Sequence, residues 1–179
     1  SRAGASNTAV GRGSLASNST ASFNTAVGRS TLLLNTTGQY NTALGGYALD
    51  ASTTASNNVA VGYDALGANT TGDGNVAIGT YALDANTTGT PNTAVGYQAL
   101  SSNTTAGNNT AVGYNALLSS TTGSQNVGVG AYAGDAITTG HYNTYLGTYA
   151  GGASTTADNN TAVGRSVLLT NVTGTNNTA

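Results

Sequence analysis

The chain has 179 residues, of which 6% are charged, 26 are glycine and none is cysteine, and its formal net charge is -2. Binding to nucleic acid needs a basic surface that this composition does not supply, and cationic anchoring to a membrane surface is equally unsupported. Without cysteine there is no disulfide and no thiolate metal site. We therefore expect no nucleic-acid partner, no membrane insertion and no cofactor.

A unit of 17 residues is repeated ten times across residues 7–176, without an insertion or a deletion. The copy that starts at 92 reads NTAVGYQALSSNTTA, and the next copy reads NTAVGYNALLSSTTG. Residues 1–6 match the last six positions of a copy, and residues 177–179 begin an eleventh. We interpret residues 1–179 as a single repeat array and expect it to be cut from a longer chain.

Several positions of the unit hold one residue type throughout. Position 1 is asparagine in all copies: Asn7, Asn24, Asn41, Asn58, Asn75, Asn92, Asn109, Asn126, Asn143, Asn160 and Asn177. Position 5 is glycine in all copies: Gly11, Gly28, Gly45, Gly62, Gly79, Gly96, Gly113, Gly130, Gly147 and Gly164. Position 4 is always aliphatic, position 8 is mostly alanine, position 9 is mostly leucine and position 14 is always threonine.

Fixed periods below about fifty residues are typical of solenoids, propellers and arrays. Seventeen residues are too few for a helical hairpin or a propeller blade, and the abundant Asn, Thr and Gly disfavour helix. "TAVG" and "YAL" favour short strands, whereas "NTTG" favours a turn. We predict an all-β fold, a parallel β-solenoid of ten coils with two short strands and two turns in each coil.

In such a solenoid every position stacks on its own copy at about 4.8 Å, so an insertion of one residue would turn the following side chains to the wrong face. The asparagine column is predicted to form a structural ladder, each side chain bonding to the copies above and below. The glycine column is predicted to need a positive φ or a turn too tight for a Cβ atom.

The apolar positions divide into two sets. We expect the valine at position 4 to be buried together with one leucine per coil. A second set at positions 9 and 10 is expected to face neighbouring chains: Leu32, Leu33, Leu117, Leu118, Leu168 and Leu169. Because one thin coil buries little apolar area, lateral association of chains would add stability.

"NTAVGYQAL" followed by "NTTG" resembles the repeats of tail-fibre-type surface fibre proteins of bacteria and their phages. It is similar, more distantly, to the "AVG" and "AIG" repeats in the heads of trimeric autotransporter adhesins. The resemblance implies an extracellular homotrimer of left-handed parallel β-rolls that projects or performs attachment. Adhesin heads use a somewhat shorter repeat, so a turn must be larger here.

The only histidine, His141, has Ser124 one copy before it and Asp158 one copy after it at the same position. A ladder would place these three in the order of a hydrolytic triad. The column lies in a turn without a nucleophile elbow or oxyanion donors, so we expect a solvated histidine and no enzyme. Asp50 and Asp84 share position 10 two copies apart, about 9.6 Å, which is too far for one calcium ion, and we predict no metal site.

Tyrosines occupy positions 6 and 7 of many copies and predict either a recognition surface for carbohydrate or a receptor, or a simple covering of the fibre. The copies that contain Gly128, Gly134, Tyr145 and Gly151 depart most from the common pattern and would be the first place to seek a local site. The candidate surface recognition residues are Tyr63, Tyr97, Tyr114, His141 and Tyr145.

Six asparagines at position 12 match the acceptor sequence for N-glycosylation, or else are turn residues. They are Asn18, Asn35, Asn69, Asn86, Asn103 and Asn171. Threonines at positions 13 and 14 suggest a further hypothesis, ice binding, although adjacent residues of a strand point to opposite faces.

The sequence thus predicts the structural shaft or head of an extracellular fibre, located on a cell-surface appendage or a virion, that mediates attachment to a surface or host. Its partners would be further copies of itself and a cell-surface glycan or protein receptor. The alternative is a self-assembling filament or sheath without a receptor, and ice binding is a more distant one.

Overall fold

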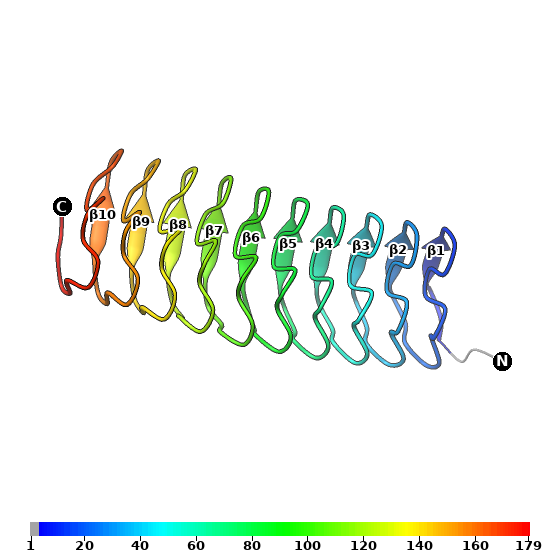
Figure 1. The fold of residues 1–179 in the computed structure, drawn as a ribbon. Helices are drawn as coiled ribbons and strands as arrows, with labels where there is room; N and C mark the ends of the chain where they lie inside the picture. The colour runs from blue at the N-terminus through cyan, green and yellow to red at the C-terminus, as the bar shows by residue number, and fades with distance from the viewer. Residues whose placement is uncertain (1–3) are drawn as a thin grey trace.

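Ten parallel strands stack in chain order into a single β-solenoid, and β1 and β10 lie at its opposite ends (Figure 1). This is seen in a computed structural model that describes residues 4–179; residues 1–3 of the first partial copy lie outside the described residues. The strands are β1 (Thr8–Val10), β2 (Thr25–Val27), β3 (Thr42–Leu44), β4 (Val59–Val61), β5 (Val76–Ile78), β6 (Thr93–Val95), β7 (Thr110–Val112), β8 (Val127–Val129), β9 (Thr144–Leu146) and β10 (Thr161–Val163). Among residues 4–179 no helix has the length and apolar character needed to cross a bilayer.

Each strand pairs with its own copy seventeen residues away, for example Ala60 with Ala77. The all-β parallel solenoid predicted from the repeat is therefore confirmed. The prediction of two strands per copy was wrong, because each described copy has one strand of three residues. Positions 7 and 9, and position 17 apart from Pro91, take left-handed backbone angles, such as φ 58° at Tyr81, 52° at Leu83 and 61° at Asn57, and such residues do not continue a strand.

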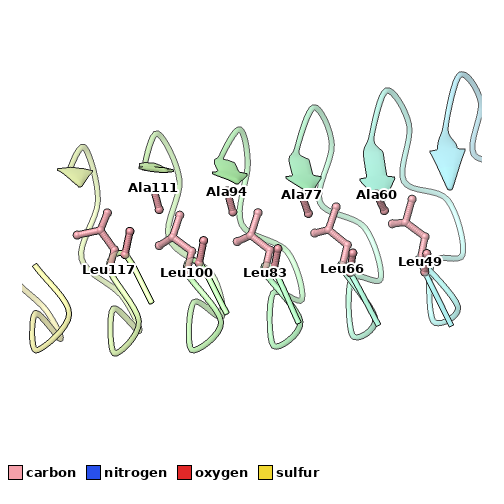
Figure 2. Close-up of a cluster of buried hydrophobic side chains, with 14 of the residues drawn as sticks. Leu49, Ala60, Leu66, Ala77, Leu83, Ala94, Leu100, Ala111 and Leu117 are labelled. Atoms are coloured by element: carbon pink, nitrogen blue, oxygen red, sulfur yellow. The ribbon is translucent and has the colours of Figure 1, made fainter. Parts of the chain in front are cut away.

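The core is built from positions 3, 8 and 9. Figure 2 shows the position 9 leucines in one row, directed towards the position 3 alanines of β4–β7. The prediction that position 4 is buried was wrong. On a strand alternate side chains face opposite ways, so when the alanine at position 3 faces inward the residue at position 4 faces outward. Leu44 is 39% exposed and Ile78 is 40% exposed, whereas Leu66 and Ala77 are fully buried.

Leucines at position 9 were expected to face neighbouring chains, and this was wrong for Leu32 and Leu117, which are fully buried in their own coil. Leu168 packs against the same core. The position 10 leucines reach the surface, as Leu169 shows with 41% of its area exposed.

The core changes its residues in the copies that depart from the pattern. Position 9 is Gly134 in one copy and Gly151 in the next, and the ring of Tyr145 fills the space that two leucines would take. A Cβ atom on Gly134 would lie 2.6 Å from Cδ2 of Tyr145, and one on Gly151 would lie 2.5 Å from its Cδ1. In these copies one large ring replaces two leucines in the core, and the three residues form no local surface site.

Candidate functional site

The asparagine ladder at position 1 runs through the stack as predicted. Each backbone N–H from Asn24 to Asn177 donates to the side-chain Oδ1 of the asparagine one copy earlier, at 2.8–3.0 Å. In several rungs the side-chain Nδ2 also donates to that Oδ1, as Asn58 does to Asn41 at 3.2 Å. The same Nδ2 of Asn58 donates across the coil to the carbonyl of Gly72. The ladder ties both neighbouring coils and the two sides of one coil together.

The glycine column at position 5 meets both conditions predicted for it. All ten glycines have φ between 125° and 140°. A Cβ atom on Gly45 would lie 2.6 Å from the carbonyl carbon of Gly62 in the next coil. Only glycine satisfies this backbone angle and this close approach, so the column ends each strand at the same place.

The asparagines of the predicted glycosylation sequences form a second inner column at position 12. Asn35, Asn69, Asn86 and Asn103 are fully buried, Asn18 is 8% exposed, and Asn171 is half-buried. Each donates its Nδ2 to the position 15 carbonyl of its own copy, the carbonyl that also accepts from the position 1 asparagine. The nitrogen that would carry a glycan is thus directed inward and hydrogen-bonded, and the folded coil has no room for a sugar on the buried members.

His141 lies in a column that has a structural explanation. Ser124 Oγ is 3.0 Å from His141 Nδ1, but Asp158 Oδ1 accepts from the backbone N–H of His141 at 2.6 Å and does not orient the ring. The backbone N–H of Ser124 also donates to Nδ1. In this column the side chain of one copy accepts from the backbone of the copy before it, as Ser56 does from Gln39. The three residues are brought together, without the carboxylate-to-imidazole contact of a triad.

Seven tyrosines form one continuous line of rings, called here the tyrosine row: Tyr47, Tyr63, Tyr81, Tyr97, Tyr114, Tyr132 and Tyr149. Successive ring centroids lie 5.0–6.4 Å apart. The row is continuous because a residue at position 7 donates its N–H to the position 6 carbonyl of the preceding copy, as Tyr81 does to Tyr63 at 3.0 Å. One tyrosine from either position therefore stands in each copy from Tyr47 to Tyr149, along one edge of the solenoid.

Three of the candidate recognition residues belong to this row and are well exposed: Tyr63 at 48%, Tyr97 at 42% and Tyr114 at 47%. The other two lie elsewhere. His141 belongs to the position 16 column beside Tyr142, at 6.1 Å between ring centroids. Tyr145 is 0% exposed, so its prediction as a surface recognition residue was wrong. Burial raises the pKa of the Tyr145 hydroxyl above its usual value.

A cation of the chain lies at one end of the tyrosine row. The guanidinium carbon of Arg29 is 5.4 Å from the ring centroid of Tyr47, which is within cation–π range. Arg12 and Arg165 stand at the same position of the first and last copies, and among residues 4–179 no cation–π contact to the row is seen besides that of Arg29. The row therefore holds a cation at its first member in the folded chain itself.

Several aspartate carboxylates lie near the tyrosine row. Asp64 stands at position 7 of a copy whose position 10 is Gly67, and its carboxylate occupies the space that a side chain at Gly67 would take. Asp64 thus lies between Asp50 and Asp84. Desolvation by burial is the main cause that raises the pKa of each of these two carboxyl groups, and the charge of Asp64 raises it further. Desolvation above all raises the pKa of Asp84 to about 6, and its Oδ1 is buried without a hydrogen-bond partner.

The spacing of position 10 alone did not predict that Asp50, Asp64 and Asp84 are neighbours, because Asp64 belongs to position 7. The signal in the sequence was Gly67, which leaves position 10 of that copy free for the carboxylate of Asp64. Desolvation, then Tyr63 and Asp64, raise the pKa of the Tyr81 hydroxyl, and Asp135 adds to the same effect at Tyr132. Within residues 4–179 no group of three or more His, Cys, Asp or Glu side chains has the arrangement needed to hold a metal ion.

The threonine columns differ in exposure. Each position 13 threonine from Thr36 to Thr155 donates its Oγ1 to the position 13 carbonyl of the next copy. The position 14 threonines, such as Thr105, are exposed. A single exposed column remains, and ice binding stays a prediction.

No family model, curated protein or solved structure matches the chain.

Proposed function

We propose that the chain is the shaft or head of an extracellular fibre that mediates attachment to a surface or host. The observation that carries this proposal is the outward face of the ten strands. Position 4 is aliphatic in every copy and projects from the sheet, with Leu44, Ile78 and Leu146 between 39% and 45% exposed. Apolar patches of this length on a surface are typical of contacts between chains.

In this proposal three chains pack their outward strand faces together as a homotrimer of left-handed rolls. The in-register stacking of the strands supports this assembly, because the regularly spaced side chains on the face of one chain can meet the same spacing on another. The tyrosine row then repeats on each chain of the rod. Repetition turns weak contacts into strong attachment, since each further contact forms at a high effective concentration.

A second candidate is a self-assembling filament without a receptor. It is supported by the constant register of the strands. The strand at one end of a chain matches the strand at the opposite end of a second chain, and unpaired strand edges are templates for pairing.

Electron microscopy of the purified chain, together with the binding of labelled particles to cell surfaces, tests the first candidate against the second. Discrete rods of one length that bind to surfaces are expected of the attachment fibre. Filaments that lengthen with protein concentration and bind to no surface would overturn it and favour the second candidate.

A further inference from the structure

The tyrosine row runs through a part of the chain that has no positive side chain. Residues 30–164 contain all six aspartates and neither lysine nor arginine. Among residues 4–179 the one cation–π contact seen in the row is that of Tyr47 with Arg29, which precedes this segment.

Two kinds of negative potential coincide along this edge. The face of each tyrosine ring carries the negative part of the ring quadrupole. Asp64 and Asp84 lie close enough to the row for their charges to act on Tyr81, and the charge of Asp135 acts on Tyr132. Asp50 adjoins Asp64. Positive groups are attracted to this edge by both, and the contact between Arg29 and Tyr47 gives the geometry that such a group would take.

We propose that the tyrosine row is a docking surface for a basic peptide segment of a partner protein, whose guanidinium groups contact the exposed rings while the flanking carboxylates attract them. We rest this inference on the proposed attachment role, because it specifies the partner that the repeated surface holds. A neutral glycan would use the ring faces but would gain nothing from the line of carboxylates, and an acidic partner would be repelled by it.

The dimensions suit a short peptide. An extended hexapeptide is about 20 Å long, and rungs stacked at about 4.8 Å place four tyrosines along that length. Arginine side chains are long and flexible, so their guanidinium groups reach rings on successive rungs without a fixed spacing in the peptide.

The test measures the fluorescence anisotropy of labelled hexa-arginine with the full chain, in a fraction whose native mass has been determined. We expect saturable binding that weakens as salt increases. Substitution of Tyr63, Tyr97 and Tyr114 by serine is expected to weaken binding at least about tenfold, because each exposed cation–π contact contributes several-fold. The matched control replaces Tyr40 and Tyr142, which are each 56% exposed and lie outside the row, and should leave binding unchanged.

A second pair of variants tests the charges without removing a ring. Asp84→Asn, beside the row, is expected to weaken binding several-fold, whereas Asp73→Asn, at an exposed position outside it, is expected to have a smaller effect. Equal losses in this pair, or equal binding by the triple and control tyrosine variants, would overturn the proposal. So would maltohexaose binding as tightly as hexa-arginine.

A change of native mass in the triple tyrosine variant would show that the row forms contacts between chains and would also overturn the proposal. The wild-type measurement does not depend on which assembly is present. Binding by a monomer would therefore contradict the trimeric fibre and leave the basic-peptide surface intact, whereas a trimer that binds no hexa-arginine would do the reverse.

Discussion

Single residues fix the path of each coil through backbone angles that most side chains avoid. Leucines at position 9 have φ near 50°, as Leu66 does at 53°, and the glycines at position 5 have still larger values. A left-handed angle costs a leucine about 1–2 kcal/mol, which burial of its side chain offsets. The glycines have no such compensation available, because a side chain there would meet the next coil.

Two adjacent glycines give a direct test at this scale. Gly45→Ala is expected to lower the free energy of unfolding by about 2–5 kcal/mol, since φ is 127° and the added Cβ overlaps the backbone of Gly62. Gly46→Ala is the matched control, because the nearest atom to its Cβ is 3.6 Å away on Tyr63. Urea denaturation of both variants would measure the difference, and equal stabilities would contradict the role given to the glycine column.

Asp84 predicts how stability depends on pH. Its pKa is raised in the folded chain from 3.8 to about 6, so between these values the folded chain holds a proton that the unfolded chain releases. Stability is therefore expected to be highest below about pH 4 and to fall as the pH rises through 6. Asp50, Asp64 and Asp135 have pKa values raised in the same direction and strengthen the trend.

Thermal unfolding at pH 4, 5, 6 and 7, followed by circular dichroism, would measure this dependence. Asp84→Asn is expected to raise the Tm at pH 7 and to flatten the profile, and Asp73→Asn serves as the exposed control. A Tm that rises from pH 4 to pH 7 would contradict the placement of these carboxylates.

At the scale of one element, each coil is held together by hydrogen bonds from asparagine side chains. Asn24 and Asn35 lie on different sides of one coil, and both donate to the carbonyl of Gly38. The second column is less complete than the first. Its amide stack runs from Asn69 through Asn86 to Asn103 and ends where the next copy has Ser120, which leaves Oδ1 of Asn103 without a partner.

The core exchange around Tyr145 predicts that its substitutions are not additive. Tyr145→Ala should cost about 3–5 kcal/mol, because it leaves a cavity beside two glycines. Gly151→Leu alone should also destabilise, since the ring occupies that space. Combining Tyr145→Ala with Gly134→Leu and Gly151→Leu restores the residues of the regular copies and should recover much of the loss. Additive losses measured by urea denaturation would show that the ring does not replace the leucines.

The fold class and the polar columns could be predicted from the sequence because they depend only on period. Asn58 and Gly45 recur at fixed positions, and stacking determines their surroundings. The inward face could not be predicted in the same way, because a strand of three residues is too short for alternation to show which side is buried. The pairing of Tyr145 with Gly134 and Gly151, and of Asp64 with Gly67, depends on contacts between different positions, which the period does not reveal.

At the scale of the whole molecule, the outward strand face and the tyrosine row are built from different positions of the repeat. The first is aliphatic and suits contact between copies, and the second is aromatic and acidic. Position 4 substitutions should therefore affect assembly selectively. Ile78→Asp with Val112→Asp is expected to reduce the native mass to that of one chain, because charges are costly in an apolar interface. Thr88→Asp with Thr105→Asp, at exposed residues of position 14, is the control and should leave the mass unchanged.

The measurement that tests the proposed fibre most directly is the native mass of the 17.4 kDa chain by sedimentation equilibrium over a range of concentrations. The trimer predicts a constant mass of about 52 kDa, three times that of one chain. A constant mass of 17.4 kDa, or a mass that increases without limit as concentration rises, would contradict it.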